Sequence, residues 1–150
     1  MRSARSLAIS AIVVILILAA SAYLASGSGK ERTAEISVNG TQYNVYIAAT
    51  PEQQAQGLMN VTEVGTCSGY GNCLGMLFVF GSDSNQCFWM KDTQIPLDQY
   101  WIENGTITSE AQGTPYSLTP ICHNGNWVLE TPANTSIRVG QKAALIKYLT

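Results

Sequence analysis

The segment from Phe88 to Asp98 concentrates side chains that could bind a small molecule. It reads Phe-Trp-Met-Lys-Asp-Thr-Gln-Ile-Pro-Leu-Asp, which combines two aromatic rings, one cation and two carboxylates. Successive side chains of a strand point to opposite faces, so Trp89 and Lys91 would be presented together if Phe88 and Met90 face the core. A stacking plane beside a cation and hydrogen-bonding groups is typical of one wall of a small-molecule site.

The same segment also has a purely structural interpretation, in which Trp89 fills one end of the domain. Lys91 would then pair with Asp92 or Glu130. In either case we expect the Lys91 ammonium within reach of Asp98 or Glu130, because a partly covered ammonium is costly unless a carboxylate meets it. Strand alternation places Asp92 on the opposite face from Lys91.

Asp98 and Glu130 are carboxylates inside otherwise apolar sequence. Two carboxylates that face one cavity can act as acid and base when their surroundings separate their pKa values. With Lys91 they form the candidate machinery of a hydrolase or lyase, although no catalytic residue can be assigned. In the structural interpretation, Asp98 accepts backbone N–H groups after the Pro turn, and Glu130 pairs with Lys91 or Arg138.

Five motifs occur in a fixed order along the chain. They are Glu52-Gln53, Gly57-Leu58-Met59, Gly75 to Phe80, Phe88 to Asp98, and Val128 to Glu130. Together they resemble the DUF192 (UPF0127) family, small proteins of unassigned biochemical role, and the resemblance covers residues 35–149. It implies a small β-rich domain and does not name a substrate.

The first 25 residues differ in composition from the rest. Arg2 and Arg5 precede an uncharged apolar run over residues 7–25. That run is at the lower limit of length for a membrane-spanning helix and is longer than the usual core of a cleaved signal peptide. We expect a signal anchor over residues 1–25, with a cytoplasmic N-terminus and the remaining chain exported. A cleaved signal peptide, which would leave the protein secreted, is the alternative.

Residues 26–33 contain the Ser-Gly repeats typical of a flexible tether, and residues 34–150 have the length of one domain. Beyond residue 26 the chain keeps six basic and ten acidic side chains, with no basic cluster. Nucleic acid is therefore not an expected partner, because phosphate binding needs clustered Lys and Arg. The expected partners are the membrane, through residues 7–25, and a small polar ligand or an envelope protein.

An even number of cysteines in an exported domain predicts two disulfides. Of the three pairings, we favour Cys67–Cys73, because a five-residue spacer of loop composition separates them, and Cys87–Cys122 is then the second pair. No Cys-x-x-Cys motif is present, so a metal site made by these thiols and His123 is not expected, nor is a cofactor. Nucleophilic catalysis by Cys122 and His123 would require a free thiol.

Asn-x-Ser/Thr sequons predict glycosylation in a host that modifies exported proteins. They begin at Asn39, Asn60, Asn104 and Asn134. Two of them coincide with Asn-Gly turns, where an exposed acceptor belongs.

Turn signals divide the domain into short strands. Asn39-Gly40 and Asn104-Gly105 predict hairpins, and residues 50–53 (Thr-Pro-Glu-Gln) predict the start of one short helix. Met76–Phe80 reads as a strand buried on both faces, and Ser136–Val139 as one of roughly eight or nine strands in all. The predicted class is mainly β: a single β-sandwich or partly closed barrel with one short helix, preceded by a transmembrane helix.

These features predict a membrane-tethered extracytoplasmic module that binds a small polar ligand or an envelope partner. The alternatives are an enzyme of the hydrolase or lyase type and a structural surface protein whose edge strands pair with neighbours. A concave pocket with perturbed ionisation would favour chemistry, and solid packing would favour a scaffold. The candidate ligand-binding residues are Trp89, Lys91, Asp92, Thr93, Asp98 and Glu130.

Overall fold

The computed structural model describes residues 32–67 and 69–149, which form one compact unit. The predicted anchor over residues 1–25 lies outside the described residues. The first strand begins at Arg32, so the last two residues of the predicted tether belong to the sheet. Within the described chain, no helix has both the length and the apolar character needed to cross a membrane.

Seven strands and one short helix make up this unit. They are β1 (Arg32–Val38), β2 (Thr41–Ala48), α2 (Pro51–Gln56), β3 (Cys73–Phe88), β4 (Leu97–Glu103), β5 (Thr106–Gly113), β6 (Ile121–Pro132) and β7 (Ala143–Leu149). The strand order is β5-β4-β6-β3-β2-β1-β7, and all neighbours are antiparallel except β2 and β3. The predicted mainly-β class with one short helix is therefore confirmed.

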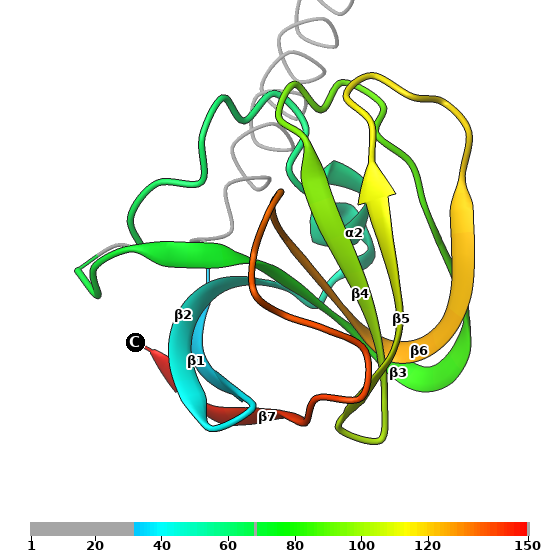
Figure 1. Cartoon of the computed structure of the whole chain (residues 1–150). Coiled ribbons are helices and arrows are strands. Elements are labelled where there is room, and N and C mark those ends of the chain that lie inside the picture. Colours follow the sequence, from blue (N-terminus) through cyan, green and yellow to red (C-terminus); the bar gives the residue numbers. More distant parts are fainter. Residues whose placement is uncertain (1–31, 68, 150) are drawn as a thin grey trace, which may run out of the picture. The chain divides into compact units, whose positions relative to one another are not determined.

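The strands form one open sheet rather than the two stacked sheets of a sandwich. Strand β3 curves strongly and pairs with both β2 and β6, with a register shift against β6 between Val79 and Ser84 (Figure 1). Near the start of β5, the Ile107 N–H donates to the Gln141 carbonyl (3.0 Å), and the Gly140 N–H donates to the Ile107 carbonyl (2.8 Å). The curved sheet thus approaches closure. Alternation within a strand identifies the two faces of the strand but not its neighbours in the sheet. The sequence therefore did not decide between a sandwich and a partly closed barrel.

Most local predictions are confirmed. Both Asn-Gly turns connect hairpins, β1–β2 and β4–β5. At α2 the Gln53 N–H donates to Thr50 Oγ1 (3.3 Å) and the Thr50 N–H donates to Gln53 Oε1 (3.1 Å), which is the predicted capping box. The predicted strand at Ser136–Val139 is wrong, since these residues lie in the connection between β6 and β7, and the described chain has seven strands rather than eight or nine.

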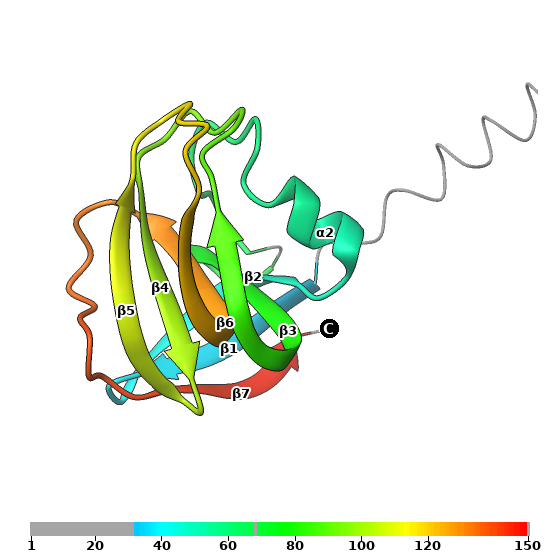
Figure 2. The ribbon, with the colours of Figure 1, turned by 90° about the vertical axis from the view of Figure 1, so that its right-hand side faces the viewer.

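The two faces of the sheet bury different clusters. In β3, β4 and β6, adjacent residues point to opposite faces. Leu77, Tyr100 and Leu129 belong to the cluster on one face, and Phe78, Trp101 and Val128 belong to the cluster on the other. Helix α2 runs beside β3 at one face of the sheet (Figure 2), and Gln54 Nε2 donates to the Val79 carbonyl (2.8 Å). We call the face of Phe78, Trp101 and Val128 the helix face.

Both predicted disulfides are present. Cys67–Cys73 closes the loop that leads into β3, and Cys87–Cys122 joins directly opposed residues of β3 and β6. No described cysteine is free. The second bridge spans the longer loop and contributes the larger constraint on the unfolded chain, on the order of 3–4 kcal/mol.

Candidate functional site

The segment that follows β3 presents its side chains as the sequence predicted. Met90 is buried with 2% of its surface exposed, whereas Trp89 is 47% exposed. Lys91 is also exposed, and its Nζ lies 5.7 Å from the centroid of the Trp89 ring. Trp89 and Lys91 therefore share a face, and Met90 turns into the core.

The predicted ion pair of Lys91 with Asp98 or Glu130 is wrong. Among the residues that the structure describes, the salt bridge of Lys91 is with Asp92, at 3.8 Å. Alternation fails here because Asp92 adopts φ 53°, in the left-handed region, so the chain leaves strand geometry immediately after Lys91. Adjacent side chains in such a turn can meet, which is the pairing that the structural interpretation allowed.

Lys91→Met is expected to change the free energy of unfolding by less than about 1 kcal/mol. The two side chains of the ion pair are 48% and 55% exposed, and exposed pairs contribute little because water and salt screen them. Chemical denaturation of the two proteins at neutral pH measures the difference. A loss of several kcal/mol would show that Lys91 has a buried partner in solution.

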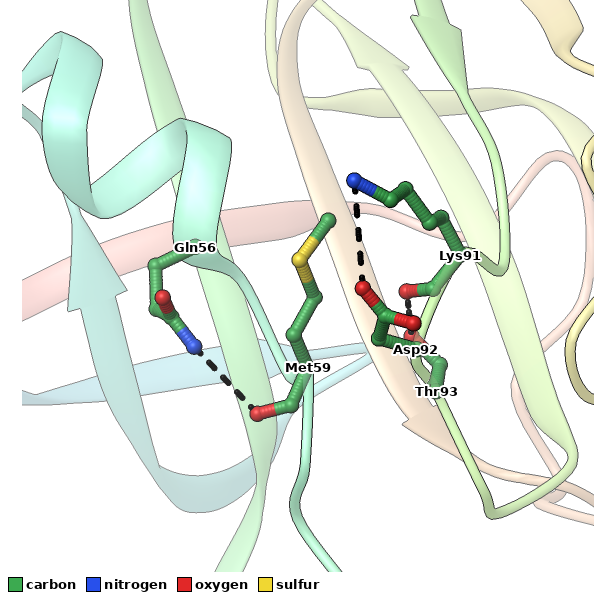
Figure 3. Close-up of polar contacts among 5 residues, drawn as sticks. All are labelled: Gln56, Met59, Lys91, Asp92 and Thr93. Carbon is green, nitrogen blue, oxygen red and sulfur yellow. Dashed lines mark hydrogen bonds and ion pairs between the residues drawn. The ribbon is translucent and has the colours of Figure 1, made fainter.

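A tight turn fastens this segment to the chain that follows α2. Thr93 is buried, and its Oγ1 donates to the Lys91 carbonyl (3.1 Å). The Asn60 N–H donates to the Asp92 carbonyl (2.8 Å). Figure 3 shows the Met59 side chain beside this turn, with Gln56 Nε2 donating to the Met59 carbonyl (3.3 Å). These contacts hold the segment that follows α2 against the turn that follows β3.

Glu130 lies in the middle of the sheet with only 4% of its surface exposed. Its strand, β6, runs between β3 and β4, and Glu130 stands opposite Met76 and Gln99. Gln99 Nε2 donates to Glu130 Oε1 (2.9 Å). Burial raises the pKa of Glu130 to about 7, and the Gln99 hydrogen bond offsets part of that rise. The carboxyl group therefore changes its protonation near neutral pH.

Glu130 lines a cavity of about 340 Å³ on the helix face, which we call the Glu130 cavity. Its walls come from α2, the residues after it, the two halves of β3, and the turn after β3. The lining residues are Gln54, Ala55, Gln56, Gly57, Leu58, Met59, Phe78, Phe80, Gln86, Cys87, Phe88, Trp89, Thr93 and Glu130. The Phe88 ring packs edge-on against Phe78 and Phe80, with centroids 4.8 and 6.3 Å apart, so the aromatic wall is preformed.

Asp98 lies on the opposite face of the sheet from Glu130. Its neighbour Gln99 bonds Glu130, so alternation along β4 turns Asp98 away. Asp98 Oδ2 accepts from the backbone N–H groups of Asn134 (2.8 Å) and Thr135 (3.2 Å). The interpretation of Asp98 as an acceptor of backbone N–H groups is thereby confirmed.

A second cavity, of about 440 Å³, adjoins Asp98, and its polar groups bond one another. The Tyr100 hydroxyl shares a hydrogen bond with Thr135 Oγ1 (2.7 Å) and donates to Asp98 Oδ2 (3.3 Å). Arg138 Nη1 donates to the Thr135 carbonyl (2.8 Å). Although this cavity is larger than the Glu130 cavity, its buried groups already have partners, so we interpret it as a structural network.

The candidate residues are therefore only partly brought together. Trp89, Thr93 and Glu130 line one cavity, with Lys91 and Asp92 beside it, whereas Asp98 does not belong to it. Gln99, the partner of Glu130, could not be found from the sequence, because a Gln inside an apolar strand belongs to no motif. Phe78 and Phe80 of the aromatic wall could have been proposed from the sequence, because Met76–Phe80 reads as a strand buried on both faces.

Asp98→Ala is expected to destabilise the fold by about 2 kcal/mol, because the backbone donors of Asn134 and Thr135 lose a charged acceptor. The same change should leave ligand binding in the Glu130 cavity intact, since Asp98 lies on the other face. Thermal unfolding and a binding titration on the same sample measure both. Lost binding without lost stability would contradict this placement.

The four sequon asparagines share one geometry. Asn39, Asn60, Asn104 and Asn134 are all exposed and all have positive φ. Their exposure is what a glycan acceptor requires, and their modification stays a prediction.

Within residues 32–67 and 69–149, no group of three or more His, Cys, Asp or Glu side chains could hold a metal ion.

Comparison with known proteins gives a family and a fold. The DUF192 family model, described as "Uncharacterized ACR, COG1430", matches residues 34–144. A crystal structure from Sinorhizobium meliloti 1021, described as a "putative transcription regulator", is similar at 30% identity and a TM-score of 0.62, over 77% of this chain and 92% of that one. A protein of unknown function from Novosphingobium aromaticivorans DSM 12444 is similar at 27% identity and a TM-score of 0.66, over 78% and 88% of the two chains. No curated protein matches the chain.

Proposed function

We propose that this chain, which belongs to the DUF192 family, is a binding module that holds a small polar ligand in the Glu130 cavity. One observation carries the proposal. A buried carboxyl group that titrates near neutral pH lines a preformed aromatic cavity, and a single amide hydrogen bond supports it.

Buried polar groups are normally satisfied within the protein. Asp98 follows this rule, with three donors directed at one oxygen. Glu130 receives one side-chain hydrogen bond from the described residues, although it is more deeply buried than Asp98. Ligand sites are typically concave and mostly apolar, with a few polar groups that fix the orientation of the ligand. The Glu130 cavity has this composition.

We also propose that the module acts on the extracytoplasmic side, tethered by residues 1–25, or secreted if that segment is cleaved. The uncharged apolar run after Arg2 and Arg5 supports export. The two disulfides support it as well, because such bonds persist in oxidising compartments. An envelope protein that inserts a side chain into the cavity is the second form of partner that this proposal covers.

A thermal-shift screen of the full-length protein tests the binding function. The library should contain small organic cations, anions and neutral compounds of similar size. Ala55→Trp places a large side chain on the exposed face of α2 at the cavity and should block binding with little effect on folding. Glu110→Gln, an exposed position at the other cavity, is the control.

The expected result is a compound that raises the melting temperature of the wild type and of Glu110→Gln but not of Ala55→Trp. A screen in which no compound shifts the wild type would overturn the proposal. Compounds that act equally on Ala55→Trp would also overturn it, because they bind elsewhere.

A further inference from the structure

We infer that the ligand of the Glu130 cavity is a small organic ammonium ion, a primary or secondary amine on an apolar body. In this arrangement the ammonium donates to the Glu130 carboxylate, and the apolar body packs against the aromatic wall. The inference rests on the proposed function and assigns its ligand to a chemical class.

The first argument is the unpaired carboxylate. The ion pairs among the described residues are Lys91–Asp92 and Lys147–Glu35, so no described cation is paired with Glu130. The buried side-chain polar atoms without a partner are Gln99 Oε1 and Asn126 Oδ1. Glu130 Oε2 accepts no hydrogen bond from the described residues, and Glu130 lines the cavity. A buried carboxylate is stable only when a charged donor or several hydrogen bonds meet it.

The second argument is the charge of the lining. Glu130 is the one ionisable side chain that α2, β3, β6 and the turn after β3 contribute to the cavity, since Cys87 is in a disulfide. Among the described residues no Lys, Arg or His lines it, and Lys91 at its rim is paired with Asp92, so an anionic ligand inside the cavity would have no cation as a partner. Residues 32–149 carry nine acidic and five basic side chains, and their field also favours a cation.

The third argument is the aromatic wall of Phe78, Phe80 and Phe88, beside which Trp89 also lines the cavity. The face of an aromatic ring carries partial negative charge and attracts ammonium groups within about 6 Å. The Lys91 ammonium, 5.7 Å from the Trp89 centroid, already uses this property at the rim of the cavity. The same wall can bury the apolar body of an amine, together with Leu58 and Met59, which also line the cavity.

Binding of an ammonium ion should be linked to the release of a proton. Because the pKa of Glu130 in the free protein is about 7, the group is mostly protonated at pH 5. An ammonium ligand requires the ionised form, so its affinity should rise up to about tenfold per pH unit from pH 5 and level off above pH 7. A neutral ligand has no such requirement.

Isothermal titration calorimetry with 2-phenylethylamine and its neutral analogue 2-phenylethanol tests the assignment on the full-length protein. At pH 7.5 the amine should bind the wild type, and Glu130→Gln should weaken its binding by about 10- to 100-fold, which is the loss expected for a charge-assisted hydrogen bond. The alcohol should bind both proteins with affinities within about threefold of each other, which shows that the cavity remains formed. Glu110→Gln should leave the amine affinity unchanged.

The possible outcomes test the chemical class of the ligand separately from the claim that the cavity binds a ligand. Equal binding of amine and alcohol, abolished by Ala55→Trp but unaffected by Glu130→Gln, overturns the ammonium assignment and leaves the binding function standing. An amine affinity that does not depend on pH between 5 and 7 overturns the assignment as well. If no amine binds while neutral compounds of the screen do, the assignment is again wrong, and if nothing binds, the proposed function fails with it.

Discussion

Gly75→Ala is expected to destabilise the folded protein by about 4 kcal/mol, above the usual 1–3 kcal/mol for overpacking. A Cβ atom at Gly75 would overlap the carbonyl oxygen of Glu130 and would lie 2.9 Å from its carbonyl carbon and 3.0 Å from Thr131 Cα. All three atoms belong to the backbone of β6, so no side-chain rotation relieves the contact. Strand β6 would have to shift at the residue that supports the candidate site.

Gly81→Ala provides the matched control for this prediction. Gly81 belongs to the same strand, β3, and a Cβ atom there meets nothing within 4 Å. We expect this change to alter stability by less than about 1 kcal/mol, in the stabilising direction, because Ala reduces the entropy of the unfolded chain. Denaturant unfolding with the disulfides intact compares the two variants. Equal stability of both would show that β3 and β6 do not approach as closely as described.

The stability of the wild type is expected to fall by about 3 kcal/mol through the titration of Glu130 as the pH rises from 4.5 to 8. The pKa of Glu130 is about 7 in the folded protein, against 4.5 for an exposed glutamic acid. Between these values the folded state holds one more proton than the unfolded state. The contribution of this group is therefore fully present below pH 4.5 and is lost as the pH rises through 7.

Glu130→Gln removes this titration, because the amide stays neutral and can still accept the hydrogen bond from Gln99. The variant should match the wild type at pH 4.5 and exceed it by about 3 kcal/mol at pH 8. Glu110→Gln should keep the wild-type dependence. Unfolding free energies at several pH values test this, and parallel curves for wild type and Glu130→Gln would mean that the Glu130 carboxyl group is hydrated.

Local structure could be predicted because its causes are local. The Asn39-Gly40 turn needs two residues that tolerate positive φ, and the Thr50 capping box needs a hydroxyl and an amide three residues apart. The expectation of export, the even number of cysteines and the five-residue spacer between Cys67 and Cys73 were together enough to predict both disulfides. The single sheet could not be predicted in the same way, because strand order depends on long-range pairing.

The candidate site, too, could be predicted only where local patterns decide the geometry. Alternation correctly presented Trp89 and Lys91 together, but it failed at Asp92, where the turn reverses the chain. Whether Asp98 and Glu130 share a face depends on the register of β4 against β6, which pairs Gln99 with Glu130. Because one residue of slip exchanges the two faces, the sequence suggested the carboxylates but could not assign them to one cavity.

The most direct test is a carbon-13 NMR titration of the Glu130 side-chain carboxyl, with and without saturating 2-phenylethylamine. We expect a pKa near 7 for the free protein, lowered by at least about one unit when the ammonium is bound, because an opposite charge favours the ionised form. A carboxyl group that titrates near 4.5, with no change when the amine is added, would contradict the buried, ligand-facing Glu130 on which the proposed function rests.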